Sequence, residues 1–230
     1  MAKNSLEQIE DLYEQFQKGV KASGNKVKTP AQKANEWVGF DLDLMDELKQ
    51  SVASALKKMP KDTDLLELVA RIYYDIDDTG LLFGVLEKWK KADKKNIIPY
   101  LYHAEYYFHN ERISYDDFIA EIKDALKIDP DSLDVLSMAY SGAKAKGDDG
   151  RQLKYACEVA SRANSADWQF IYGTLCRRSI MFERAEHEFK KGISLNPGHP
   201  YCIGGLARCY MELGKLDKAE ELFASLEHFK

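Results

Sequence analysis

The C-terminal part of the chain contains an internal repeat. Residues 166–199 align with residues 200–230 at a shift of 34, so that small residues meet small ones and large apolar residues meet large ones. Such self-similarity indicates stacked supersecondary units, because a unit of this size cannot bury its apolar face alone. The aligned pairs are Gly173 with Ala207, Phe182 with Leu216, Ala185 with Ala219, and Phe189 with Phe223.

This pattern resembles the tetratricopeptide repeat (TPR), a helix pair with a period of 34 residues. The resemblance is clear over residues 166–230 and degenerate over residues 62–165. Two positions depart from it: Cys176 stands where the next copy has Tyr210, and Gly192 stands where the family usually has Ala. The matching residues are Gly173, Ala185, Phe189 and Pro197 in one copy, and Ala207, Tyr210, Ala219 and Phe223 in the next.

Apolar residues spaced three and four apart predict an all-α chain without strands. The resemblance implies antiparallel helix pairs in a right-handed superhelix, a TPR-like α-solenoid. We expect about five pairs preceded by two N-terminal helices. The pairs are predicted at 63–76 with 80–93, 99–110 with 114–128, 132–146 with 150–164, 167–179 with 182–195, and 200–213 with 216–229.

The N-terminal region is predicted to be separate from the repeats. Residues 4–22 read as an amphipathic helix, residues 21–35 as a polar linker rich in lysine, and residues 41–59 as a second helix. We therefore divide the chain into residues 1–35 and a helical repeat domain over residues 36–230. The first helix could cap its own array, since terminal repeats need covering, or dock on a partner.

Charge and hydropathy narrow the class of partner. The net charge is −5, so the chain has no overall basic field for nucleic acid. The N-terminus lacks the apolar core of a signal peptide, and no apolar run reaches membrane length. These features predict a cytoplasmic protein without membrane contact. The four cysteines, Cys157, Cys176, Cys202 and Cys209, have no CxxC spacing and are expected to be small buried residues of a reduced protein.

The chain contains no constellation that predicts catalysis or metal binding. None of the five histidines has a partner at the i, i+4 spacing, and P-loop, GxGxxG and GxSxG motifs are absent from the sequence. The segment from Asp75 resembles a calcium loop until its twelfth place, which is Leu86 instead of Glu, so a turn between helices is the expected structure. We therefore predict a protein that is not an enzyme and needs no cofactor.

In the TPR family, the first helix of each pair lines a concave groove, and this resemblance implies where a partner would bind. Arginines and aromatic residues on those helices are expected to recognise a peptide or helix with apolar and acidic groups. Alternatively, the tyrosines pack between helices and the arginines pair with acids such as Glu183. The candidate groove residues are Tyr100, His103, Tyr107, Tyr140, Lys144, Phe170, Thr174, Arg177, Arg178, Tyr201 and Arg208.

These features favour a protein–protein adaptor or assembly scaffold. Lys and Asn at the places that grip a chaperone's C-terminal carboxylate are absent from the last two first helices, which argues against that role. The alternatives are a bacterial secretion or pilus-subunit chaperone and, in a different class, a single-stranded RNA-binding helical repeat. A second copy could also associate through the last helix, whose apolar face comprises Leu216, Leu222, Phe223 and Leu226, unless that helix packs fully on its neighbour.

Overall fold

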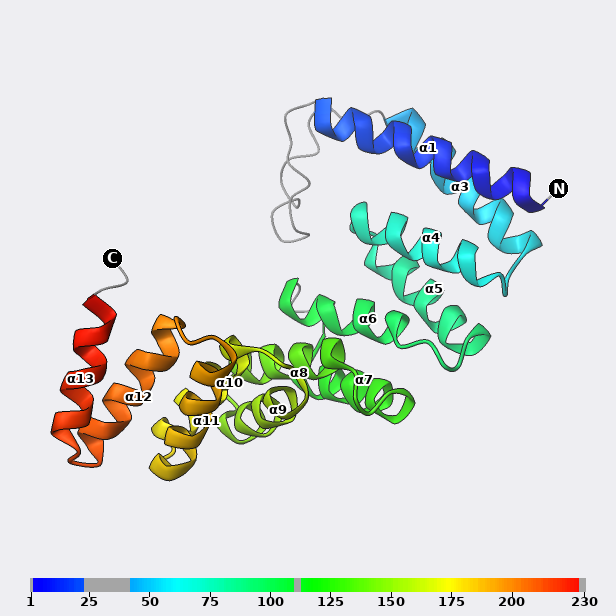
Figure 1. The fold of residues 1–230 in the computed structure, drawn as a ribbon. Coiled ribbons are helices and arrows are strands. Elements are labelled where there is room, and N and C mark those ends of the chain that lie inside the picture. The colour runs from blue at the N-terminus through cyan, green and yellow to red at the C-terminus, as the bar shows by residue number, and fades with distance from the viewer. Residues whose placement is uncertain (1, 23–41, 110–112, 228–230) are drawn as a thin grey trace. The chain divides into compact units, whose positions relative to one another are not determined.

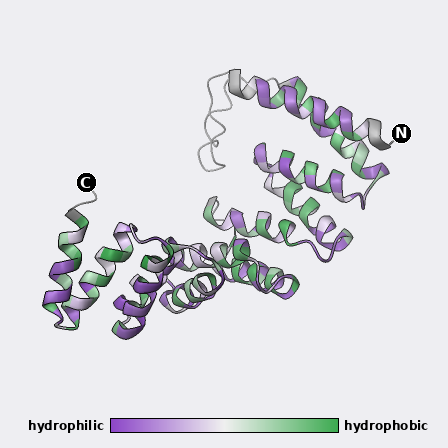
Figure 2. Ribbon diagram, in the orientation of Figure 1, coloured by the Kyte–Doolittle hydropathy of each residue, from purple (hydrophilic) through white to green (hydrophobic). Residues whose placement is uncertain are grey.

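The computed structural model describes residues 2–22, 42–109 and 113–227, and all regular secondary structure in these residues is helical (Figure 1). Hydrophobic and hydrophilic residues alternate along the helices (Figure 2), as two-sided packing requires. The helices are α1 (Ala2–Ala22), α3 (Leu42–Lys58), α4 (Thr63–Asp75), α5 (Thr79–Ala92), α6 (Ile98–His109), α7 (Tyr115–Ile128), α8 (Leu133–Lys146), α9 (Asp149–Arg162), α10 (Ala166–Arg178), α11 (Phe182–Leu195), α12 (Pro200–Glu212) and α13 (Leu216–Glu227).

The predicted all-α fold of sequential antiparallel pairs is confirmed. Each expected pair is present, and the ends of its helices differ from the predicted ends by no more than two residues. The right-handed superhelical path and the division into residues 1–35 and 36–230 stay predictions. None of the described helices is both long and apolar enough to cross a bilayer.

Contacts divide the chain into two compact units, residues 1–130 and residues 131–230. In unit 1, α1 packs against α3 and α4, and its apolar stripe is buried there, including Ile9 and Phe16. The Tyr13 hydroxyl donates a hydrogen bond of 2.5 Å to the Asp75 carboxylate of α4. The first helix is thus docked on the chain's own repeats.

The first helices of successive pairs form a layer within each unit. In unit 2, α10 contacts α12, and the rings of Tyr140 and Trp168 meet edge to face at 5.2 Å between α8 and α10. In unit 1, α1 contacts α4, and the rings of Tyr74 and Tyr102 join α4 to α6. We call α1, α4 and α6, and likewise α8, α10 and α12, the first-helix layer of their unit.

Local turn chemistry explains where the helices stop. Asp78 caps α5 by accepting the Leu81 N–H at 3.2 Å, so the calcium-like segment is a turn between helices, as expected. Gly147 and Gly214 have positive φ at the turns after α8 and α12. Ile180 has the same left-handed conformation after α10 and aligns with Gly214 at the repeat shift. The repeat geometry therefore imposes at Ile180 a backbone conformation that β-branched residues disfavour.

Small residues allow the helices of unit 2 to approach closely. The fully buried Phe189 of α11 lies between Gly173 of α10 and Gly205 of α12. A Cβ at Gly173 or Gly205 would come within 2.8 Å or 2.5 Å of the Phe189 ring. A Cβ at Gly192 would meet the Cys202 Sγ at 2.4 Å, which explains why this chain departs from the usual Ala there.

The cysteines are free thiols, and Cys176, Cys202 and Cys209 are buried, as the sequence predicts. Cys157 is only half-buried. Burial, followed by the negative charge of Asp167, raises the pKa of the Cys202 thiol to about 12, so that thiol stays protonated near neutral pH. These cysteines pack as small apolar residues.

Candidate partner-binding surfaces

The first-helix layer of unit 2 presents aromatic rings at its surface. Tyr201 of α12 is 64% exposed, and its ring lies 5.4 Å from the half-buried ring of Phe170 on α10. Buried His199 supports this pair: its Nδ1 accepts the Cys202 N–H at 3.1 Å, so its Nε2 donates to the Asp167 carboxylate at 2.9 Å. The cap of α12 therefore holds Tyr201 in a defined position.

The three candidate arginines have different surroundings. Arg177 of α10 forms an ion pair of 2.6 Å with Glu212 of α12, so it pairs with an acid, as one alternative held, although with an acid other than Glu183. Arg178, the next residue, lines a small cleft with Asp149 and other residues of α9 and α10. Arg208 is exposed on α12. Of the two neighbouring arginines of α10, Arg177 thus contacts α12, whereas Arg178 lies in a cleft beside α9.

Of the remaining candidate residues of unit 2, some pack between helices and others are exposed to solvent. Tyr140 packs edge to face against Trp168, which is the interhelical role that the sequence left open. Thr174 is half-buried on α10, and Lys144 is exposed near the end of α8. The face that joins α10 to α12 therefore comprises Phe170, Tyr201, Arg208 and the Arg177–Glu212 pair.

In unit 1, the candidates on α6 face α5 and α7. The Lys90 ammonium of α5 lies 4.7 Å above the Tyr100 ring, and the Tyr107 ring lies 4.8 Å from Phe118 of α7. The His103 ring lies 4.4 Å from Phe83 of α5. Because these side chains pack between helices of successive pairs, we leave them out of the binding surface proposed below.

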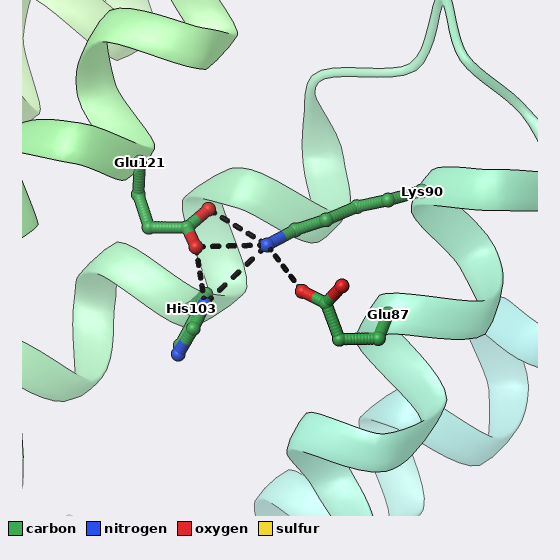
Figure 3. Close-up of polar contacts among 4 residues, drawn as sticks. All are labelled: Glu87, Lys90, His103 and Glu121. Carbon is green, nitrogen blue, oxygen red and sulfur yellow. Dashed lines mark hydrogen bonds and ion pairs between the residues drawn. The ribbon is translucent and has the colours of Figure 1, made fainter. Parts of the chain in front are cut away.

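His103 belongs to a polar cluster that sequence reasoning missed (Figure 3). The Lys90 ammonium lies 2.8 Å from the Glu121 carboxylate, 3.0 Å from that of Glu87 and 3.4 Å from the His103 Nδ1. Burial raises the pKa of Glu121, but hydrogen bonds from His103 and Lys90 outweigh it and hold the pKa below its usual value. The cluster joins α5, α6 and α7.

Among the described residues, Glu87, His103 and Glu121 bring ligand atoms close enough to hold a metal ion. The Lys90 ammonium, however, contacts all three groups, as Figure 3 shows. A positive charge of the chain itself already occupies this place and would repel a second cation. We therefore assign the cluster as an ion-pair network.

A second feature that sequence reasoning did not predict lies on the side of α6 that faces α4. The Tyr74 ring of α4 meets the rings of Tyr102 and Tyr106 of α6 at 5.6 Å and 5.4 Å, both edge to face. Acidic residues surround these rings, among them Asp75 and Glu105. The tyrosine-rich run of residues 100–107 was the signal for this face, but the rotation of the helix decides which tyrosines it contains.

The last helix pair exposes a large share of apolar surface. Four of the large hydrophobic residues exposed in the described part of the chain belong to it: Tyr201, Met211, Leu216 and Phe223. Leu216 is 61% exposed and Phe223 is 38% exposed, whereas Leu222 and Leu226 are half-buried. Of the four residues predicted to mediate self-association, Leu216 and Phe223 are thus the ones with substantial solvent exposure.

Comparison with known proteins agrees with this architecture. Residues 181–229 match a family model described as tetratricopeptide repeat. The chain has the fold of the solved structure of YrrB, a TPR protein with an unusual peptide-binding site, at a TM-score of 0.59 and 16% identity over 76% of this chain and 90% of YrrB. The family match thus covers α11, α12 and α13, and the chain has the TPR-like fold.

Other solved structures share the fold. MamA matches with a TM-score of 0.57 and 18% identity over 73% of this chain and 91% of MamA. MamA from Desulfovibrio magneticus RS-1 matches with a TM-score of 0.54 and 13% identity over 72% of this chain and 93% of that protein. No curated protein matches this chain with significant sequence similarity. At these identities the likeness describes the fold alone.

Proposed function

We propose that this chain is a non-catalytic adaptor or assembly scaffold that binds a peptide or helix of another protein on the first-helix layer of unit 2. The observation that carries the proposal is the exposed Tyr201 ring, which lies beside Phe170, together with exposed Arg208 two turns further along α12. Tyrosine and arginine dominate the binding energy of protein interfaces. The peptide-binding site named for YrrB supports this use of the fold.

The chemistry of the surface specifies the ligand. Tyr201 and Phe170 offer a rigid apolar contact, which favours an apolar anchor residue in the ligand. The Arg208 guanidinium favours a carboxylate nearby, because its donors match carboxylate oxygens in pairs. A chaperone for secretion or pilus subunits would use the same surface for a helix of its client. We therefore expect ligands that combine acidic and apolar residues.

Selection from a library of displayed random peptides tests this ligand class. Peptides that carry an acidic residue near an aromatic or aliphatic one should be enriched, and Tyr201→Ala should weaken their binding by about tenfold or more. Arg208→Ala should weaken it to a lesser extent. Affinities are measured by fluorescence anisotropy, with Leu195→Ala and Lys154→Ala as exposed controls elsewhere in unit 2.

Two results would contradict the proposal. One is the failure of Tyr201→Ala to weaken binding more than the controls. The other is tight binding of a single-stranded RNA oligonucleotide whose affinity falls steeply between low and moderate salt, since this dependence is characteristic of phosphate contacts. The second result would favour the RNA-binding alternative.

A second candidate function is self-association through α13. Two apolar residues of α11 that pack in the core of unit 2 align, at the repeat shift, with apolar residues of α13: Phe182 with Leu216, and Phe189 with Phe223. Phe189 is fully buried, whereas Phe223 remains 38% exposed. The last pair therefore presents a side-chain pattern that stacks against a further helix, and we propose that a second copy covers it.

Light scattering coupled to gel filtration over a range of concentrations tests self-association. We expect a dimer or larger species whose fraction rises with concentration. Leu216→Asp with Phe223→Asp should make the protein monomeric, because burying two carboxylates in an apolar interface is unfavourable. Leu195→Asp with Ile180→Asp, at exposed positions elsewhere in unit 2, is the matched control. A monomer at every concentration would exclude this candidate.

A further inference from the structure

One end of unit 1 carries a group of exposed lysines that neither proposed function uses. They lie in the turn between α3 and α4 and around the end of α5. Because α4 and α5 are antiparallel, the start of α4 lies beside the end of α5, so the two segments meet at one end of the unit (Figure 1). We call these exposed residues the lysine edge: Lys57, Lys58, Lys61, Lys88, Lys91, Lys94 and Lys95.

The ammonium groups of the lysine edge have no acidic partners. Within the part of the chain that the structure describes, none of them forms an ion pair or a hydrogen bond with another side chain. Lys90, which lies among them in the sequence, is held in the network with Glu121 and is not counted. The positive charge of the lysine edge therefore faces solvent.

Acidic residues at this end are too few to neutralise the lysine edge. The turns contain Asp62, Asp64 and Asp93, and the carboxylates of Asp62 and Asp93 accept backbone N–H groups. At the adjoining end of α7, Asp124 pairs with Lys127. Seven lysines against three aspartates leave this end positive, although residues 131–230 contain equal numbers of acidic and basic side chains and the net charge of −5 thus belongs to unit 1.

Helix stability accounts for only part of the lysine edge. Lys58 and Lys91 lie in the last turns of α3 and α5, where a cation interacts favourably with the helix dipole. Lys61, Lys94 and Lys95 lie outside the helices and gain no such interaction. Like charges gathered at one end repel one another, and an anionic partner would relieve this repulsion.

A polar cleft lies beside the lysine edge, between α1 and α3. Its volume is about 310 Å³, and Lys58 forms part of its lining. From Lys58 the cleft follows α3 back to Gln50, a distance of about 12 Å at the rise of an α-helix. The exposed side chains of Gln8, Gln50 and Ser54 line it and form no hydrogen bond with another described residue. They can therefore bind a peptide backbone, of which about four extended residues span this distance.

We propose that the lysine edge and this cleft together bind an acidic peptide segment of a partner protein. The backbone of the segment lies in the cleft against Gln8, Gln50 and Ser54, and its carboxylates face Lys58 and the rest of the lysine edge. The ammonium group of lysine is a strongly hydrated point charge, so binding depends on the number of charges more than on one fixed geometry. This inference goes beyond the proposed function, because it places a second binding site on unit 1.

Two other classes of anionic partner fit this end of unit 1 less well. Single-stranded RNA requires aromatic rings on which bases stack, and the one aromatic side chain in residues 57–64 and 88–98, that of Trp89, is buried. An anionic bilayer is a broad surface that would also meet Asp64 and Asp93, whereas a narrow peptide can follow the lysines. The hydrogen-bonding groups of the cleft also favour a peptide.

A defined pair of probes tests the proposal on the full chain. The first is a labelled peptide of twelve residues with four glutamates separated by Gly and Ser, which lacks the apolar anchor expected at Tyr201. The second has four lysines in place of the glutamates. Anisotropy titrations should show binding of the glutamate peptide that weakens with added salt, and no binding of the lysine peptide. Failure of the glutamate peptide to bind at low salt would overturn the proposal.

Sedimentation with vesicles of phosphatidylcholine and phosphatidylserine distinguishes a membrane from a peptide as the partner. We expect the chain to stay in solution. If it sedimented with these vesicles and did not bind the glutamate peptide, the lysine edge would be a membrane-binding surface and the proposal would be wrong.

Charge variants locate the binding. Lys94→Gln with Lys95→Gln should weaken binding of the glutamate peptide by about fivefold. Lys18→Gln with Lys154→Gln makes the same change in net charge at exposed positions of α1 and α9 and should weaken it by less than about twofold. Equal weakening by the two pairs would mean that the peptide responds only to the total charge of the chain, which contradicts the assigned site.

A third variant tests the cleft without changing any charge. Gln50→Ala with Ser54→Ala should weaken binding of the glutamate peptide by about threefold or more, while circular dichroism reports whether the helices are retained. Unchanged binding would show that the segment does not enter the cleft.

Arg208→Ala in unit 2 separates this proposal from the proposed function. It should leave binding of the glutamate peptide unchanged, because the lysine edge belongs to unit 1. Loss of binding in this variant would place the peptide on the surface of unit 2 and overturn the second site.

Discussion

Phe189→Ala should lower the free energy of unfolding by about 3–5 kcal/mol. The Phe189 ring is fully buried in the core of unit 2, and its neighbours on α10 and α12 at the contact are Gly173 and Gly205. Neither glycine has a side chain that could move into the space the ring leaves. The cavity would therefore persist, which is the condition under which a large-to-small substitution costs most.

Urea unfolding followed by circular dichroism measures this effect, and the chain provides its own control. Phe223 occupies the equivalent place one repeat later and is 38% exposed. Because it has less buried surface to lose, Phe223→Ala should cost about 1 kcal/mol. If the two substitutions had equal effects, the close packing of α11 between α10 and α12 would not be the main stabilising contact of the C-terminal repeats.

Lys90→Met is expected to lower the free energy of unfolding by about 2–3 kcal/mol, because it leaves the Glu121 carboxylate with a positive partner only when His103 is protonated. The Lys90 and Glu121 side chains are 10% and 16% exposed, so solvent screens their interaction only in part. This exposure places the cost between that of a surface pair and that of a fully buried one. Thermal or urea unfolding measures it.

Two further variants test the assignment of this network. Glu87→Gln removes the outer partner, which is 54% exposed, and should cost no more than about 1 kcal/mol. Glu121→Leu in the Lys90→Met background should restore part of the lost stability, since replacing both partners leaves no unpaired charge. A Lys90→Met variant as stable as the wild type would show that the network does not hold α5, α6 and α7 together.

The pH dependence of Glu121→Gln provides an independent check. The folded pKa of Glu121 lies below its ordinary value of 4.5, so its ionised form contributes stability above that pH. This contribution is lost as the pH falls through the folded pKa. The stability difference between the wild type and Glu121→Gln should therefore be largest near neutral pH and shrink in acid. A difference that stayed constant down to acidic pH would contradict the assignment.

The helices themselves could be read from the sequence because their determinants are local. Apolar spacing predicts each amphipathic segment, and residues such as Asp78 and Gly214 end one helix or begin the next through contacts within a few residues. The repeat shift also identified the last two pairs, over residues 166–230, where small residues align with small ones and large apolar residues with large ones. These features were confirmed with small errors at the helix ends.

The sequence did not predict which face of α6 is buried. Its sequence, IPYLYHAEYYFH, carries aromatic residues on every side, so no single stripe distinguishes the buried face from the exposed one. The structure directs His103 toward α5 and α7, and Tyr102 toward α4. In an evenly aromatic helix this choice depends on how well its neighbours fit, which periodicity does not report.

Ion pairs between residues far apart in the sequence could not be predicted from the sequence either. Arg177 pairs with Glu212, which is 35 residues away, and Lys90 meets Glu121, which is 31 residues away. Many acids lie at comparable distances along the chain, and only the stacking of successive pairs selects among them. The sequence alone therefore determined that this chain forms stacked helix pairs, because capping, turns and periodicity act over a few residues. The tertiary structure decided which side chains share a face, because that depends on how each helix is rotated against its neighbours.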